Sequence, residues 1–341
     1  MSVSTILITA VNALFPLILT ILLGYFLKCR GFLTKEFLKV GNKLVFNVCL
    51  PAMLFVNVYD IAGFAAINWD IVLYACAAFG LVVAVGFVVT VLTTPVPERR
   101  GVIWQCAFRS NFGIIGLSLA AALGGEEAVA VAAIVSSFTV PLFNIMAVIA
   151  LSVFVDCGKG KTSVKKILLN IVKNPLIIGV ALGLVCLGIR ELQNALFGRL
   201  LFSIQRDTTF IYKTLSNLKA IASPFALIVL GGQFEFSAVK GLMKEIVSGT
   251  VARIVIAPLI GIGCAILVST HTDWLACGVN EYPALIAMFG SPVAVSSAVM
   301  AGNMGSDEQL ATQLVVWTSI FSIFTIFAQV CILMGAGLLA V

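Results

Sequence analysis

The stretch FRSNFGIIGLSLAAALGGEEAVA, residues 108–130, places a cation, an amide, four glycines and two acids in a largely apolar run. An unbroken transmembrane helix gains nothing from such residues. In hydrocarbon every backbone N–H and C=O must find a partner inside the protein. We therefore expect a helix that breaks near mid-membrane, where protein groups or a polar cavity satisfy the freed backbone.

The composition identifies an integral membrane protein. Of 341 residues, 61% are hydrophobic and 11% are charged, whereas soluble globular chains carry roughly 25% charged residues. A span needs about 20 apolar residues. Ten candidate spans are predicted at 5–27, 37–58, 70–92, 102–123, 128–151, 174–190, 215–234, 246–268, 279–301 and 309–335.

The distribution of Lys and Arg predicts the orientation. With the N-terminus outside, the inner loops hold twelve of these residues and the outer loops hold four. The N-terminal stretch lacks a basic flank and is too long for a signal peptide, so we interpret it as a retained span. We predict a multi-pass protein of the cell (plasma) membrane with both termini outside.

Two connections between predicted spans are long. The basic segment 156–173 is expected to be a cytoplasmic linker between residues 1–155 and 174–341. In the segment 190–213, leucine and isoleucine recur at roughly helical spacing. We expect a helix on the outer membrane surface there, with a loop packed against the bundle as the alternative.

An internal repeat relates the two halves. Shifted by 181 residues, the opening stretch aligns with FGSPVAVSSAVMAGNMGSDEQLA, residues 289–311. Each half has five spans, an odd number, so the copies face opposite ways. The predicted fold is all-α, with ten transmembrane helices in two inverted five-helix repeats and broken crossover helices four and nine. Such an arrangement is typical of alternating-access transporters.

The two breaks provide the candidate substrate site. Pro292 removes a donor and disfavours helical geometry at Ser291. Half-helix N-termini direct positive dipole ends into each break, which suits an anion. The candidate substrate-binding residues are Ser110, Asn111, Gly113, Ser291, Pro292, Ser296, Ser297 and Asn47.

Each candidate has a structural alternative. Asn111 either binds substrate or caps the broken helix, and the serines either line the crossing or allow close helix packing. Arg109 either attracts an anion or extends to the inner face. Arg253 is expected to be an anchor at the inner interface.

Four acids follow the two breaks. Glu126, Glu127, Asp307 and Glu308 are expected to start the fifth and tenth spans, where acids favour the helix dipole. Their alternative role is proton or sodium coupling.

Several motifs resemble those of the auxin efflux carriers of bacteria and plants, within the larger bile-acid/arsenite/riboflavin transporter group. The motifs are NFGIIGLS (111–118), SPVAVSSAVMA (291–301), LPAMLF (50–55) and KNPLIIGVALGL (173–184). The resemblance extends over nearly the whole chain. It implies a scaffold domain, a transport domain, a substrate site where spans four and nine cross, and a homodimer through the scaffold.

We therefore expect a secondary active transporter of small organic anions, a dicarboxylate such as malate or an auxin-like carboxylate. A transporter-like membrane sensor or receptor and a sodium-coupled bile-acid-type symporter are the alternatives. A membrane enzyme is disfavoured because the chain has one histidine and no Asp-rich motif. We expect no cofactor, and we expect Na⁺ or H⁺ as the coupling ion. The formal charge of +6 does not imply a nucleic-acid partner, because the distribution of this charge sets the orientation in the lipid bilayer.

Overall fold

The computed structural model describes residues 3–60, 68–155, 169, 172–272 and 274–339. The helices of the first half are α1 (Val3–Cys29), α2 (Lys35–Leu44), η1 (Val45–Cys49), α3 (Leu50–Tyr59), α4 (Trp69–Thr93), α5 (Pro97–Phe108), η2 (Phe112–Gly116) and α6 (Leu117–Val155). The second half contains α8 (Pro175–Phe197), α9 (Ile204–Asp207), α10 (Thr209–Gln233), α11 (Ala238–Val251), η3 (Ala252–Ile256), α12 (Ala257–Gly261), α13 (Gly263–His271), α14 (Glu281–Leu285), η4 (Ile286–Gly290), α15 (Ser296–Asn303) and α16 (Glu308–Gly335). The η elements are single π-helical turns within longer helices.

The all-helical, multi-pass membrane fold is confirmed. Within the described residues, seven helical segments are long and apolar enough to cross a membrane. They are Lys35–Tyr59, Trp69–Thr93, Leu119–Phe154, Pro175–Phe197, Thr209–Gln233, Ala238–His271 and Glu308–Gly335. Ile18–Cys29 within α1 is a shorter apolar segment.

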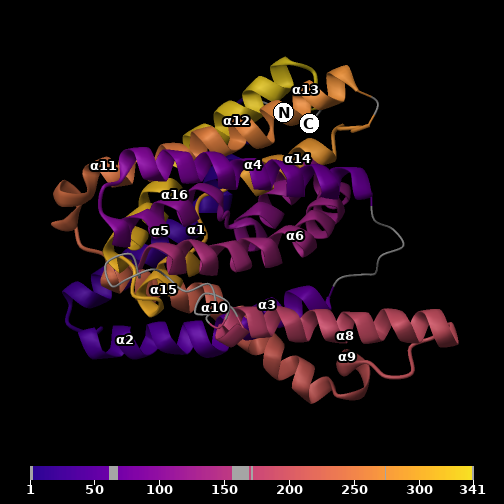
Figure 1. Ribbon diagram of the computed structural model, residues 1–341, viewed down its shortest axis with the longest axis horizontal. Helices are drawn as coiled ribbons and strands as arrows, with labels where there is room; N and C mark the ends of the chain where they lie inside the picture. The colour runs from indigo at the N-terminus through magenta and orange to yellow at the C-terminus, as the bar shows by residue number, and fades with distance from the viewer. Residues whose placement is uncertain (1–2, 61–67, 156–168, 170–171, 273, 340–341) are drawn as a thin grey trace.

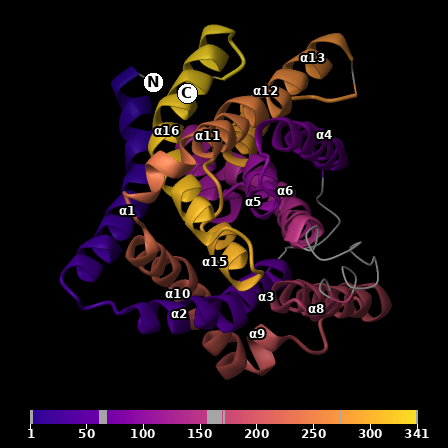
Figure 2. The same cartoon turned by 60° about the vertical axis from the view of Figure 1, so that its left-hand side comes forward.

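The helices form two layers. Helices α2, α3, α8 and α10 lie together in one layer, which we call the panel (Figure 1). Helices α4, α5, α6 and α11 to α16 form the second layer, which we call the crossing bundle. The start of α1 and the end of α16 lie side by side in both views (Figure 2).

Helix α1 packs closely on α10 through glycine. A Cβ at Gly231 would lie 2.0 Å from the Ile21 carbonyl oxygen, and a Cβ at Gly24 would lie 2.2 Å from that of Ile228. Small residues let helix backbones approach in a membrane, where van der Waals contact drives association. The pair therefore depends on the absence of side chains at both positions.

Both predicted helix breaks are present. Helix α5 ends at Phe108 and Arg109 is extended, with φ −87° and ψ 91°. Turn η4 ends at Gly290, and Ser291 is extended, with φ −63° and ψ 150°. Helix α6 contains a third interruption at Gly125, with φ 67° and ψ −158°, which divides it into two helices.

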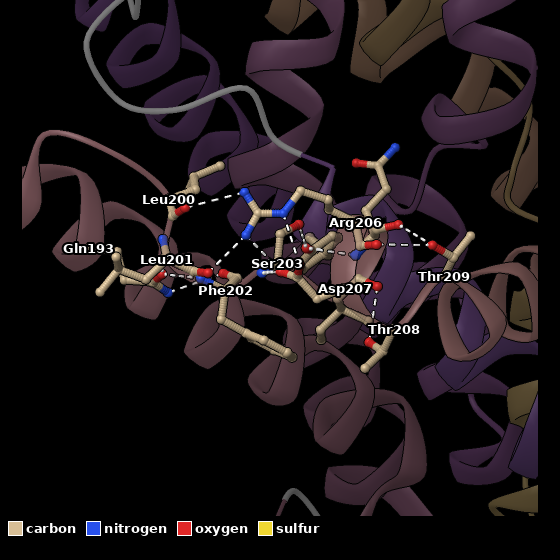
Figure 3. Close-up of polar contacts among 12 residues, drawn as sticks. Gln193, Leu200, Leu201, Phe202, Ser203, Arg206, Asp207, Thr208 and Thr209 are labelled. Carbon is tan, nitrogen blue, oxygen red and sulfur yellow. Dashed lines mark hydrogen bonds and ion pairs between the residues drawn. The ribbon is translucent and has the colours of Figure 1, made fainter.

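The expected surface helix at 190–213 is wrong. Helix α8 continues to Phe197 and α10 begins at Thr209, so most of the segment extends the two long helices. The short connection is held by polar contacts (Figure 3). The Gln193 side chain accepts hydrogen bonds from two backbone amides, at Leu201 and Phe202.

Arg206 and Asp207 complete this connection. The Arg206 guanidinium donates to the Leu201 carbonyl at 2.8 Å and to the Asp207 carboxylate at 2.9 Å. Asp207 also accepts from the Ser203 amide at 2.8 Å. The hydrogen bond from Arg206, followed by that from Ser203, holds the pKa of Asp207 below its usual value.

The two ends of the molecule carry different polar clusters. We call one the Arg99 end, where Arg99 bonds Glu245 at 2.8 Å and Asp307 at 3.1 Å. We call the other the Tyr59 end, where the Tyr59 hydroxyl lies 2.9 Å from that of Ser203. The predicted cytoplasmic linker 156–173 lies mostly outside the described residues.

Candidate functional site

The two breaks meet and satisfy each other's backbone. The Asn111 amide donates to the Pro292 carbonyl at 2.9 Å, and the Ala294 amide donates to the Arg109 carbonyl at 3.0 Å. Ser110 and Val293 thereby form an isolated antiparallel bridge. Buried backbone groups need such partners because hydrocarbon offers none. The crossing thus holds two unwound segments from opposite halves of the sequence.

A small cavity lies between this crossing and the panel. Its volume is about 60 Å³. The crossing bundle contributes Arg109, Ser110, Asn111, Gly113, Val140, Phe143, Asn144, Ala294, Val295 and Ser296. The panel contributes Leu50, Met53, Leu54, Asn57, Leu176, Ser223 and Ala226. Half of the bundle residues are polar or charged, whereas the panel wall is mostly apolar.

Arg109 lies inside the protein rather than extending to its surface. Its side chain is 3% exposed and lines the cavity. One guanidinium nitrogen donates to the Asn144 amide oxygen at 2.7 Å, and another contacts the Met300 sulfur. No carboxylate among the described residues pairs with it. A buried cation without a counter-charge is costly, so an anion in this cavity would be stabilised.

Asn111 also presents a free donor. Its side chain forms no cap on the following helix turn, although the expected alternative was a cap. The Asn111 Nδ2 atom and the Ser110 hydroxyl are buried and have no hydrogen-bond partner within the structure. A ligand that offers acceptor oxygens would satisfy both groups.

A second cavity leads from the crossing to the Tyr59 end. Its volume is about 470 Å³, and both cavities are lined by Leu54, Asn57, Gly113 and Val140. It extends to Asp60 and Lys219, whose side chains are 3.5 Å apart. The second cavity therefore adjoins the crossing cavity and extends toward the Tyr59 end.

At the Arg99 end, Glu308 bridges the two layers beside a separate cavity of about 360 Å³. One oxygen of Glu308, on α16, accepts hydrogen bonds from Asn42 on α2 and Gln233 on α10, both at 2.8 Å. Gln309 donates to the Gln233 carbonyl at 3.2 Å. These contacts join the crossing bundle to the panel.

Sequence comparison agrees with this membrane architecture. The signature of a family described as Membrane transport protein matches residues 9–328. The chain belongs to this family, that of the auxin efflux carriers. An uncharacterized transporter of Methanocaldococcus jannaschii is 24% identical over 318 residues, which cover 91% of this chain and 94% of that relative.

The structure brings four of the predicted site residues of this transporter to the crossing cavity, namely Ser110, Asn111, Gly113 and Ser296. Four others do not line it. Ser291 is buried and donates to the Ala287 carbonyl, while Pro292 contributes its carbonyl to the pairing of the breaks. Ser297 is buried behind Ser296 in α15. Asn47 is exposed and donates to the Lys43 carbonyl at 2.8 Å.

Sequence reasoning missed Asn144 and misplaced Arg253. Asn144 is an amide within a long apolar helix, and that isolated polarity was an available signal. Arg253 is 1% exposed, so the expected interface anchor is wrong. Glu245, on the preceding helix α11, pairs with Arg99.

The acids after the breaks take different roles. Asp307 caps α16, since its carboxylate accepts from the Leu310 amide at 2.9 Å. Glu127 accepts from the Asn280 side chain at 2.8 Å. Within the described residues, no group of three or more His, Cys, Asp and Glu side chains is placed to hold a metal ion.

Proposed function

We propose that this protein is a secondary carrier of small organic anions that works by alternating access, with its substrate site at the crossing of the two broken helices. One observation carries the proposal. Arg109 is buried at the cavity wall, and no carboxylate of the described chain pairs with it. A substrate carboxylate is the counter-charge that this cation lacks.

The other donors of the site fit the same ligand. Asn111 Nδ2 and the Ser110 hydroxyl are free, and α15 begins at Ser296 beside the cavity. A helix N-terminus adds a positive dipole end. The apolar wall from the panel suits the carbon skeleton of a dicarboxylate such as malate or of an auxin-like acid.

The inverted repeat of ten spans is part of the proposal. Besides the seven long apolar segments, three further stretches would cross the membrane and bring the total to ten. These are α1, the stretch from α5 to Gly125, and the broken helix formed by α14, η4 and α15. Each half would then contribute one broken helix to the crossing. We infer that the Tyr59 end faces outside in a cell membrane, as the distribution of Lys and Arg predicts.

Alternating access requires two states that differ in which end is open. The cavity leads to the Tyr59 end, while Glu308 bridges the two layers at the Arg99 end. We infer that this arrangement corresponds to the state open to the Tyr59 end. The opposite state needs the Glu308 contacts to separate and the Tyr59 end to close.

Uptake into proteoliposomes tests the proposal. Labelled malate, malonate, succinate, indole acetate and taurocholate are supplied with and without sodium and proton gradients. Saturable uptake of a carboxylate supports the carrier and identifies its substrate class, and the effective gradient identifies Na⁺ or H⁺ as the coupling ion. Saturable uptake of taurocholate with sodium alone would favour a bile-acid-type symporter. Tight binding without flux would favour a sensor.

A further inference from the structure

Arg253 binds the ends of both broken helices from behind the cavity. Its guanidinium donates to the Ala107 carbonyl at 3.2 Å, at the end of α5. It also donates to the Phe289 carbonyl at 2.6 Å, at the end of η4. Bonds to the Met288 and Ser291 carbonyls, at 3.1 and 3.0 Å, complete the set. One side chain thus holds carbonyls from both halves of the chain.

These acceptors carry negative charge. The last carbonyls of a helix lack partners within the helix, and each C-terminal end carries about half a negative elementary charge. Two such ends amount to about one negative charge, which one guanidinium offsets. No carboxylate in the described part of the chain pairs with Arg253, so the carbonyls are its counter-charge.

Without the Arg253 side chain, the helix dipoles alone would not favour an anion over a cation at the crossing. Each break brings together one negative C-terminal end and one positive N-terminal end. The N-terminal ends belong to η2 and α15, and residues Gly113 and Ser296 beside them line the cavity. The C-terminal ends would repel an anion held by those N-terminal ends.

We propose that Arg253 is a positioning residue that makes the crossing selective for anions, by neutralising the C-terminal ends of both broken helices. The N-terminal ends and Arg109 then dominate the potential in the cavity. Arg253 does not line either cavity, so it acts through the backbone it binds rather than by touching the ligand. This inference rests on the proposed function for its biological meaning, although its electrostatic content can be measured without a substrate.

The test measures the potential at Ser296. A Ser296→Cys variant places a thiol at the cavity, and none of the cysteines that the structure describes lines either cavity. The probes are an anionic and a cationic methanethiosulfonate, sulfonatoethyl and trimethylammonioethyl. Protein without this substitution supplies the background from native thiols. The ratio of the two rates reports the local potential.

Arg253→Met and Arg253→Gln remove the charge, and Arg253→Lys keeps it. We expect the anionic-to-cationic rate ratio to fall about tenfold or more in the neutral variants and to stay within about threefold in the lysine variant, since a nearby charge in a low-dielectric site is worth more than about 1.4 kcal/mol. Thermal melting is measured alongside. A ratio that stays unchanged in a folded neutral variant would overturn the proposal.

If neither neutral variant folds, the Arg253→His variant tests the electrostatic role instead. Imidazole titrates between pH 5 and 8, so the charge can be switched within one folded sample. A rate ratio that rises on acidification, relative to the Arg253 protein, supports the proposal, and a ratio with the same pH profile contradicts it. If instead the ratio responds as expected while no anion is transported, the proposed carrier function fails and the electrostatic role stands.

Discussion

The Asn111 amide donates to the Pro292 carbonyl at 2.9 Å, so the break in one half of the chain is closed by the break in the other. Neither unwound segment could remain in hydrocarbon alone, because its free backbone groups would lack partners. The pairing also fixes the Asn111 side chain, whose Nδ2 atom stays without a partner at the cavity wall. The Asn111 backbone therefore closes the break, and its side chain remains available to the proposed ligand.

Asn111→Ala should abolish most uptake without loss of stability. The substitution removes a side-chain donor that has no partner among the described residues, so the cost falls on the bound anion. A hydrogen bond to a charged group is worth about 1.5–3 kcal/mol, or about tenfold to a hundredfold in KM. Uptake kinetics and melting temperature are measured together. Asn68→Ala, which removes only the cap of α4, is the control and should keep normal kinetics. Unchanged KM in Asn111→Ala would remove this residue from the site.

The two breaks were predictable because their residues disrupt helices on their own. Pro292 and the polar group of Arg109, Ser110 and Asn111 are local signals. The role of Arg253 was not predictable, since its partners are backbone carbonyls and any residue type supplies those. Its charge suggested a surface position, and only the fold brings two helix ends to it.

The sixth span was predicted to end at residue 190, because a charged side chain again indicated the membrane surface. Arg190 suggested a membrane boundary, yet α8 continues to Phe197. The Arg190 guanidinium donates to the Tyr59 carbonyl at 3.0 Å and lies 5.9 Å from the Tyr59 ring centroid. A tertiary contact therefore accommodates the charge within the helix.

Gly231→Ala should destabilise the protein. The added Cβ would lie 2.0 Å from the Ile21 carbonyl oxygen. This oxygen belongs to the backbone of α1, so it cannot move aside as the end of a flexible side chain can. Overpacking of this kind costs about 1–3 kcal/mol. Unfolding in mixed micelles measures the change. Gly80→Ala is the matched control, because a Cβ there meets nothing within 4 Å. Equal stability of the two variants would contradict the close packing of α1 on α10.

The connection between α8 and α10 should depend on pH only in acid. The pKa of Asp207 is lowered from its usual value of 3.8, chiefly by Arg206. A lowered pKa gives stability that is present above the usual value and is lost as pH falls through the folded value. Hydrogen-exchange protection of the Ser203 amide should therefore be constant at neutral pH. Asp207→Asn should reduce it at every pH, whereas Glu191→Gln should not, and protection that falls between pH 8 and 5 would contradict this.

Glu308→Ala should open the Arg99 end. The change removes the shared acceptor of Asn42 and Gln233, and with it two hydrogen bonds between the layers. Glu308→Gln retains an acceptor oxygen and should have a smaller effect. Asn303 lines the separate cavity beside Glu308 at this end, so maleimide labelling of an Asn303→Cys reporter measures the opening. We expect labelling to rise about tenfold, as the loss of one to two hydrogen bonds predicts.

Glu235→Ala is the control for the loss of the Glu308 hydrogen bonds. Glu235 lies 3.9 Å from Lys28 in a half-exposed pair, and such pairs contribute little. Labelling that rises equally in both alanine variants would show a general loosening of this end rather than release of a specific contact.

Asn144→Asp should block transport while it preserves the fold. The Asn144 oxygen lies 2.7 Å from the Arg109 guanidinium, so a carboxylate there would supply the counter-charge that the anion otherwise provides. The internal pair would compete with every anionic substrate, and KM should rise by about a hundredfold or more, since a buried charge pair exceeds about 3 kcal/mol. Asn144→Ala removes the amide oxygen that Arg109 binds, introduces no counter-charge, and should retain anion binding. Uptake kinetics and melting temperature distinguish the two variants. Equal uptake by both would show that Arg109 needs no counter-charge from the substrate, and the anion site at the crossing would then be wrong.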